Sequence, residues 1–214
     1  MASKLKRDQI PPEKAKNWKD SIREEEKLTL NLNIPQITLQ KETYKKLAGE
    51  NENRVRIYLG LEPVNINEQL TLCAFAVSAF LLGSGDVYVD YETPVFKLEK
   101  QNIDFSSKTS EVIESLKRYR SWRSGELDSE NETAAIRQYI YPNGYLLTKF
   151  ELHEIFNVQN KIEAKIEFGI SKLMEVMIMP EAAEARSVDE ETEVYNQGFP
   201  CPPYCDDRSP YNSL

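Results

Sequence analysis

RVRIYLGLEPVNINEQLTLCAFAVS, residues 54–78, carries the most apolar pattern in the chain, and the rest of the fold is predicted around it. It contains two strongly apolar segments, residues 55–61 and 70–77, whose branched and aromatic side chains favour strands. A polar segment, residues 62–69, separates them. The pattern predicts two neighbouring strands of a buried sheet, and it makes Cys73 a small apolar residue of the core.

A fainter version of this pattern returns at residues 161–180, and the residues before both stretches correspond as well. Trp18 and Trp122 each lie in a helical pattern, 104 residues apart. Pro35 and Pro142 each end an apolar segment, 107 residues apart. We therefore predict an internally duplicated α+β fold, in which a helix-strand-helix-strand-strand unit occurs twice and builds mixed or antiparallel sheets. The alternative is one ordinary α+β domain whose halves share an element order by coincidence.

These patterns divide the chain into three parts. Residues 1–105 are predicted to form the first α+β repeat together with extra strands, and residues 106–181 the second repeat. Residues 182–214 form an acidic tail rich in proline and aromatic residues. The two repeats either share one core, related by a pseudo-two-fold axis, or sit as twin lobes, since an isolated unit would bury too little apolar surface to be secure.

The C-terminal tail loses the hydrophobic periodicity of the body, and its composition is typical of segments outside a folded core. It is predicted to be disordered or to act as a docking segment, because aromatic residues are spaced along an otherwise polar stretch. It would dock on another subunit or on the body of its own chain. The candidate docking residues are Tyr195, Phe199, Cys201, Tyr204, Cys205, Tyr211 and Leu214.

Cys201 and Cys205 flank two prolines and a tyrosine, and three interpretations of the pair are open. Two thiols do not complete a tetrahedral zinc site, and the single histidine, His153, lies far away in the sequence. A disulfide is compatible with the spacing but is disfavoured in the reducing cytoplasm. A peptide motif without metal or redox chemistry is therefore the favoured interpretation.

The end of the chain resembles a known group of proteins. Short proteins of Bacteroidota that have no assigned function often end in a C-P-P-x-C segment followed by Ser-Pro and Asn, as residues 201–205 and 209–212 do here. Some of them also carry a V-R-I-Y-x-G-L strand similar to residues 55–61. The resemblance covers a minor part of the chain, and it implies a lineage and a related fold but no activity.

Composition and charge narrow the classes of function. With 40% hydrophobic and 29% charged residues, the chain has the make-up of a soluble globular protein. Its longest apolar run, residues 70–82, is too short to span a membrane, and the N-terminus lacks the apolar core of a signal peptide, so we predict a cytoplasmic protein. The net charge of −8 disfavours nucleic-acid binding. Residues 117–123 do mix basic and aromatic side chains, but helical periodicity favours a packed aromatic face with solvated arginines.

Residues able to support catalysis or cofactor binding are sparse. A Ser-His-Asp arrangement would depend on His153, which falls on the solvent side of a predicted helix, and the sequence has no glycine-rich phosphate loop. Asp86, Asp90 and Glu92 share one face of a predicted strand, where they would either bind a divalent cation or, as we favour, form the solvated face of an edge strand. No catalytic residue, metal ligand or cofactor is therefore assigned, and enzyme activity is not the leading expectation.

The leading hypothesis is a non-enzymatic structural, assembly or adaptor protein that uses its C-terminal tail to dock on a protein partner or on another copy of itself. The alternative is a small-molecule or nucleotide-responsive enzyme whose pocket lies between the two repeats, where pseudo-symmetric folds often hold a ligand. The two hypotheses differ in where the tail lies and in whether a pocket exists between the halves.

Overall fold

The structure, a computed structural model, describes residues 5–25, 32–62, 70–83, 87–99, 106–126, 134–180, 193–196 and 198–212. The first half contains β1 (Gln9–Ile10), α1 (Pro12–Glu25), β2 (Leu32–Asn33), β3 (Ile37–Gln40), α2 (Lys41–Ala48), β4 (Arg54–Leu61), β5 (Leu70–Leu81) and β6 (Tyr88–Leu98). The second half contains α3 (Thr109–Ser124), α4 (Ala134–Ile140), β7 (Gly144–Leu147), α5 (Lys149–His153), the π-helical turn η3 (Glu154–Val158), β8 (Glu163–Ile170) and β9 (Met174–Pro180). The C-terminal segment adds β10 (Val194–Tyr195) and β11 (Gly198–Cys201). Within these ranges no helix combines the length and the apolar character that crossing a membrane requires.

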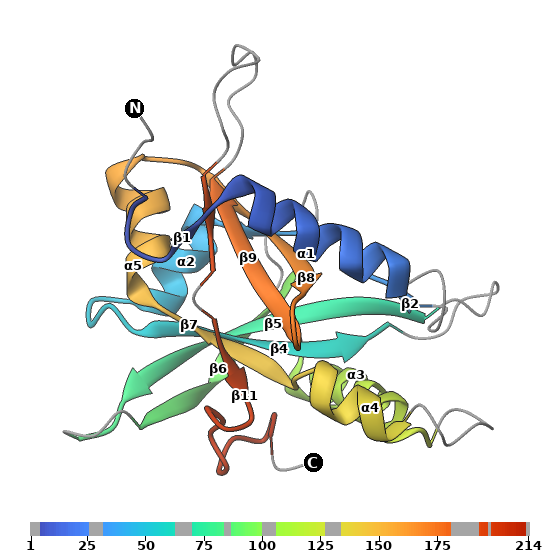
Figure 1. Cartoon of the computed structure of the whole chain (residues 1–214). Coiled ribbons are helices and arrows are strands. Elements are labelled where there is room, and N and C mark those ends of the chain that lie inside the picture. The colour runs from blue at the N-terminus through green and yellow to red at the C-terminus, as the bar shows by residue number, and fades with distance from the viewer. Residues whose placement is uncertain are drawn as a thin grey trace.

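The strands form two sheets, whose strands run in different directions in Figure 1. The first sheet has the order β1-β10-β9-β8-β3 and antiparallel pairing. The second has the order β11-β7-β4-β5-β2, with β6 also paired to β5, and it is antiparallel except for the β2–β5 pair. Helix α1 packs on β8 and helix α3 on β4. The predicted α+β class with mixed or antiparallel sheets is confirmed.

Each half of the chain contributes a strand that pairs with a strand of the other half. β3, from the first half, pairs with β8, from the second, and places Ile37 opposite Ile166. β7, from the second half, pairs with β4, from the first, and places Tyr145 opposite Ile57. The internal repeat stays a prediction, although this reciprocal pairing is what two units related by a pseudo-two-fold axis would form. Because neither half completes its sheet alone, the two halves share one apolar core.

β4 and β5 form the hairpin predicted from the most apolar stretch of the sequence. Both faces of this hairpin are buried. Ile57 and the residues at alternate positions face the shared core, whereas Tyr58 and Cys73 face a second apolar cluster beneath α3. Burial on both faces explains why the two segments are almost continuously apolar. The connecting residues 63–69 lie outside the described ranges.

Two segments differ from the secondary structure expected of them. The sequence of residues 135–141, AIRQYIY, is strand-like in its branched and aromatic side chains, but these residues lie mainly in helix α4. The Arg137 guanidinium there lies 5.2 Å from the centre of the Trp122 ring and donates to the Trp122 carbonyl oxygen, so packing on α3 outweighs the strand propensity of the segment. Residues 39–48 have the pattern of one short helix, but residues 39 and 40 end β3 because β8 offers them a pairing edge.

Residues 193–196 and 198–212 of the C-terminal segment belong to the folded body, which corrects the expectation that this part of the acidic tail lies outside it. β10 lies between β1 and β9, and β11 extends the second sheet by pairing with β7. Tyr195, Cys201 and Tyr211 are buried. Of the predicted roles, docking on the body of its own chain is the one that the described part of this segment displays.

Candidate functional site

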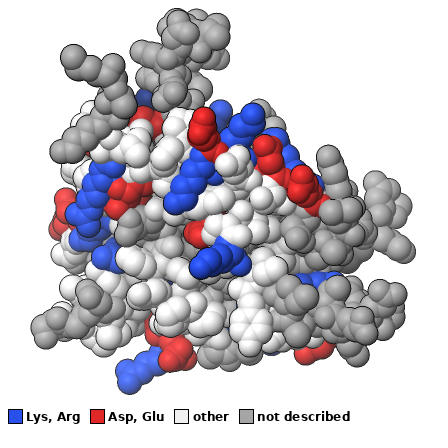
Figure 2. All heavy atoms as spheres, viewed as in Figure 1, with Lys and Arg blue, Asp and Glu red and all other residues white. Residues whose placement is uncertain are grey.

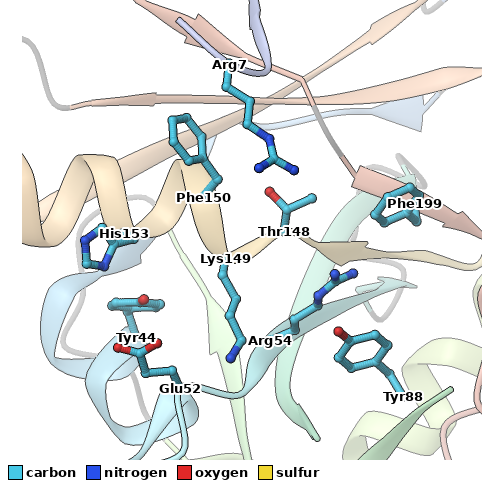
Figure 3. Close-up of a pocket in the computed structure, with 10 residues that line it drawn as sticks. All are labelled: Arg7, Tyr44, Glu52, Arg54, Tyr88, Thr148, Lys149, Phe150, His153 and Phe199. Carbon is cyan, nitrogen blue, oxygen red and sulfur yellow. The ribbon is translucent and has the colours of Figure 1, made fainter. Parts of the chain in front are cut away.

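A pocket of about 380 Å³ opens where the two halves of the chain meet. Side chains from α2, β4 and β6 in the first half and from α5 in the second half line it (Figure 3). The N-terminal segment and β11 add one side chain each, Arg7 and Phe199. This is the region in which the alternative functional hypothesis expects a ligand to bind.

The pocket wall carries more positive than negative charge. Arg7, Arg54 and Lys149 supply three basic groups, and Glu52 supplies one acidic group. Figure 3 shows the basic side chains around the middle of the pocket, with aromatic rings on opposite sides of them. Charge of one sign lining a partly enclosed pocket attracts ligands of the other sign, here anions.

Arg54 is oriented by aromatic rings. Its guanidinium carbon lies 4.2 Å from the centre of the Tyr88 ring and 5.7 Å from that of Phe199. Stacking of this kind holds the plane of a guanidinium without using its N–H groups. The Nε atom of Arg54 is buried and finds no hydrogen-bond partner among the described residues. Arg54 therefore offers the pocket a cation whose orientation is held by ring contacts.

Arg7 and Lys149 add basic groups that are freer to move. The Arg7 guanidinium lies 5.6 Å from the centre of the Phe150 ring, and its Nε lies 3.5 Å from Oδ2 of Asp8. The Arg7 side chain is 73% exposed, so water screens the pair with Asp8 and the guanidinium can turn towards a bound anion. Lys149 is the first residue of α5.

The spacing of Thr148 and Glu151 in the sequence predicts a capping box, and the structure has one at the start of α5, directly behind the pocket wall. Oγ1 of Thr148 donates to Oε2 of Glu151, and the Thr148 backbone N–H donates to Oε1 at an N···O distance of 3.3 Å. Glu151 is fully buried, and this burial raises its pKa to about 7, while the hydrogen bond from Thr148 opposes the rise. Because Thr148 also lines the pocket, a carboxyl group that titrates near neutral pH adjoins the site.

Glu151 is expected to make the protein less stable as pH rises. Its pKa is raised in the folded state, so its contribution is fully present below the ordinary value of 4.5 and is lost as pH passes through about 7. The shift corresponds to about 3 kcal/mol. Urea unfolding from pH 4.5 to 8 measures the effect, with the non-ionising variant Glu151→Gln as the control. If the difference in unfolding free energy between the two proteins stayed constant over this range, the assignment would be wrong.

The residues predicted to dock lie in different places. Tyr195 and Tyr211 are buried in the body of their own chain, and Phe199 lines the pocket. Tyr204 is 46% exposed, and its ring centre lies 4.9 Å from that of Phe199. Leu214 lies outside the described ranges. In the described part of the segment, these side chains therefore do not build a single docking surface.

The two cysteines of the C-terminal segment are paired. Cys201 and Cys205 form a disulfide, with their Cα atoms 4.9 Å apart. This corrects the favoured interpretation of a motif without redox chemistry, which depended on the expected cytoplasmic location rather than on geometry. Cys73 is free and buried in the core, as predicted, and burial raises its pKa to about 12, so it behaves as an inert thiol.

The acidic residues predicted to share a strand face are separated. Asp90 points into the interior, where its carboxylate lies 3.2 Å from the Arg56 guanidinium and accepts a hydrogen bond of 2.5 Å from Tyr58. The interpretation as a solvated face is therefore wrong for Asp90, although Glu92 is exposed, and Asp86 lies outside the described ranges. Among the residues that the structure describes, no group of three His, Cys, Asp or Glu side chains is placed to hold a metal ion.

The basic and aromatic cluster at residues 117–123 is used for internal packing. Its aromatic rings are buried, as predicted. Its arginines, expected to be solvated, bind carbonyl oxygens instead: Arg118 donates to Leu61 at 3.1 Å, and Arg120 donates to Tyr211 at 2.6 Å. On the face shown in Figure 2, basic and acidic side chains are mixed, and uncharged surface lies between them.

Reasoning from the sequence missed most of the pocket. Arg7, Tyr44 and Thr148 come from separate segments, and no spacing in the sequence connects them. One available signal was Arg54, a basic residue that follows a polar turn and begins the most apolar predicted strand. A charged side chain at that position lies at the end of a sheet, where the described pocket opens.

Comparisons of the chain with protein-family models, with curated proteins and with solved structures found no match. The resemblance to proteins of Bacteroidota therefore stays a prediction. A function for this chain has to be argued from the chemistry of its own pocket.

Proposed function

We propose that the protein is a binding module for a small anionic ligand that carries a planar ring. The observation that carries the proposal is Arg54, a guanidinium that lines the pocket and is held against the rings of Tyr88 and Phe199. The planar donor arrangement of a guanidinium fits the oxygens of a carboxylate or a phosphate.

The surroundings of Arg54 favour an anion. Arg7 and Lys149 lie on other sides of the same pocket, so a bound anion would meet positive charge from three segments of the chain. Glu52 offsets one of these charges. Hydrogen bonds between ionised partners are stronger than those between neutral groups, which makes a charged ligand the better match.

The aromatic lining favours a ring on the ligand. Four aromatic rings line the pocket: Tyr44, Tyr88, Phe150 and Phe199. Arg54 lies nearest to the ring of Tyr88. Aromatic rings attract one another in stacked or tilted arrangements and bury much apolar area with little loss of side-chain freedom. A volume of about 380 Å³ lies at the lower end of the range for ligand pockets, so the ligand is small.

The polar side chains beside the pocket form hydrogen bonds with neighbours close in the sequence. Thr148 and Glu151 bond to each other and to the backbone in capping α5. Nδ1 of His153 lies 2.9 Å from Nδ2 of Asn157, one turn further along the chain. These contacts give no reason to assign a reaction, and the proposal accordingly concerns binding and not catalysis.

Assembly through the C-terminal tail, the leading expectation from the sequence, has less support from the described residues. The aromatic side chains of that segment contact their own body, and Phe199 builds a wall of the pocket. The proposal therefore gives the segment a role in ligand binding, not in partner docking.

The proposal is tested by the melting temperature of the protein in the presence of three anions: inorganic phosphate, benzoate and phenyl phosphate. A ligand that binds the folded state raises the melting temperature. Phenyl phosphate is expected to raise it most, because it offers both a doubly charged group and a ring, and inorganic phosphate is expected to raise it less. Identical melting temperatures with and without each of the anions would contradict the proposal.

Arg54→Gln is expected to weaken phenyl phosphate binding by about tenfold or more, since a hydrogen bond to a charged group contributes about 1.5–3 kcal/mol. Lys172→Gln is the matched control, because it removes one positive charge at an exposed position that does not line the pocket. Isothermal titration measures both affinities. Equal weakening by the two substitutions would indicate a general charge effect and would exclude Arg54 as the anion-binding group.

A further inference from the structure

The C-terminal strap, residues 198–212, joins a wall of the pocket to the disulfide. Phe199 reaches the pocket from β11, and two residues later Cys201 is bonded to Cys205. β11 is an edge strand of its sheet and is held by pairing with β7. Pro200, in the middle of β11, has no N–H to give to that pairing. The position of Phe199 therefore depends on the pairing of β11 with β7 and on what holds the chain beyond β11.

Beyond the disulfide, the strap is anchored in the body by hydrogen bonds. Oδ2 of Asp206 accepts the backbone N–H of Asp90 at 2.8 Å. Arg120 donates to the carbonyl oxygen of Tyr211 at 2.6 Å and to that of Asn212 at 3.0 Å. The disulfide connects this anchored end to β11 across a loop with a sequence separation of 4. It thus passes the rigidity of the anchored end to the edge strand that carries Phe199.

Cys205 is the more exposed of the two disulfide cysteines. Cys201 is fully buried, whereas Cys205 is half-buried and follows the exposed residues 202–204. A thiolate attacks a disulfide at the sulfur that it can reach. Attack on Sγ of Cys205 would leave Cys201 as the buried leaving group.

The site also contains an acceptor that suits the reduced form. Oδ1 of Asn212 lies 3.7 Å from Sγ of Cys201. A disulfide sulfur has no proton to donate, whereas the thiol of a reduced cysteine has one. Asn212 can therefore accept a hydrogen bond from Cys201 after reduction and stabilise the reduced state.

We propose that the Cys201–Cys205 disulfide is a redox switch that controls ligand affinity in the pocket, an inference that rests on the proposed function. The reductant is a small dithiol or a dithiol protein. Its thiolate attacks Sγ of Cys205, the bond between the two protein sulfurs breaks, and Cys201 leaves as a thiolate and takes up a proton. In the mixed disulfide, one sulfur of the reductant is bonded to Sγ of Cys205. The second thiolate of the reductant attacks that reductant sulfur, and Cys205 leaves as a thiolate and takes up a proton. Two electrons pass to the protein, and the reductant becomes a disulfide.

Reduction loosens β11 and withdraws the Phe199 ring from a fixed position. Ring stacking with the ligand weakens as a result, while the contacts of the anionic group with Arg54 and Lys149 remain. The oxidised protein is thus the high-affinity form. The switch acts on the part of the affinity that comes from the ring of the ligand.

The test compares oxidised protein with protein treated with dithiothreitol. Amide hydrogen exchange in residues 198–205 is expected to become at least several-fold faster on reduction, and phenyl phosphate is expected to bind three- to tenfold more weakly, with inorganic phosphate changed less. The double variant Cys201→Ser/Cys205→Ser should match the reduced protein and should not respond to dithiothreitol. Unchanged exchange and unchanged affinity on reduction overturn the switch but leave the proposed function intact. Faster exchange without any phenyl phosphate binding in either state overturns the proposed function instead.

A second variant tests the acceptor for the reduced form. Asn212→Ala is expected to shift the thiol–disulfide equilibrium towards the disulfide by about two- to tenfold, the range expected for one hydrogen bond. Thiol titration in dithiothreitol redox buffers measures this shift without any ligand. Asp207→Ala is the matched control, because it removes the other partner of the Asn212 side chain, 3.4 Å from its Nδ2, and keeps Oδ1. An Asn212→Ala equilibrium equal to that of the control would overturn the role given to Asn212.

Discussion

Ending the chain at residue 192 is expected to unfold the protein. The truncation removes β10 and β11 and the side chains of Tyr195 and Tyr211, both fully buried. Loss of one fully buried aromatic side chain costs about 3–5 kcal/mol, and typical domains are stable by about 5–15 kcal/mol in total. Losing two such side chains, together with strand partners for β7 and β9, therefore removes most or all of the stability. Circular dichroism with urea unfolding measures the result.

Single substitutions show whether stability depends on the buried side chains of the C-terminal segment or only on its presence. Tyr211→Ala is expected to lower the unfolding free energy by about 3–5 kcal/mol, because Tyr211 fills the cluster beneath α3 and its hydroxyl donates to the carbonyl oxygen of Glu92. Tyr204→Ala, at a position that is 46% exposed, is the matched control and should cost less than about 1 kcal/mol. A truncated chain that unfolds cooperatively at the wild-type urea concentration would show that the segment is an accessory to the fold.

The failure of the sequence to place this segment has a physical reason. Its strands are two and four residues long, which is too short for any hydrophobic period to show. Its apolar contribution comes from isolated aromatic side chains whose partners lie far away in the sequence. Its acidic residues suggested solvation, but Asp206 is buried and accepts a backbone N–H from β6. Composition therefore could not predict that the edges of β7 and β9 are available for this segment to pair with.

Local patterns, by contrast, predicted local structure well. The continuous apolar character of residues 55–61 and 70–77 predicted the β4–β5 hairpin, and the spacing of Thr148 and Glu151 predicted the capping box of α5. Both depend on neighbours within a few residues or on burial of a whole segment. The pocket depends on neither, since it forms where separate elements meet. Helices α2 and α5, which line the pocket, follow β3 and β7, and each of these strands pairs with a strand of the other half. No local pattern in the sequence predicts these pairings.

Asp90 shows how the same limit applies to a single residue. Alternation along its strand predicted a solvated carboxylate, because a period of two assigns residues to faces but does not say which face is covered. In the structure, Arg56 on β4 and the C-terminal strap cover the face of β6 that carries Asp90. The charge is therefore buried, and burial raises the pKa of Asp90, while the Arg56 guanidinium opposes the rise.

Arg56→Met is expected to destabilise the protein by about 3–5 kcal/mol, because it leaves a buried carboxylate without its counter-charge. The two side chains are 1% and 0% exposed, and the guanidinium also donates to the carbonyl oxygen of Tyr88 at 3.1 Å. Lys45→Met is the control, since Lys45 forms an ion pair with Glu42 that is more than half exposed on both sides and is screened by water, so its loss is expected to leave the stability almost unchanged. Urea unfolding of the two variants distinguishes a buried pair from an exposed one.

The pH dependence of Arg56→Met provides a sharper test of the same pair. Without the guanidinium, the pKa of Asp90 rises further in the folded state, so the folded protein binds a proton more readily than the unfolded chain. Its stability should then fall as pH rises, and the deficit relative to the wild type should be smaller at pH 5 than at pH 8. In the double variant Arg56→Met/Asp90→Leu both charges of the buried pair are gone, so part of the lost stability should return and the added pH dependence should disappear. A deficit that is equal at both pH values would mean that Asp90 draws its stabilisation from Tyr58 and not from Arg56.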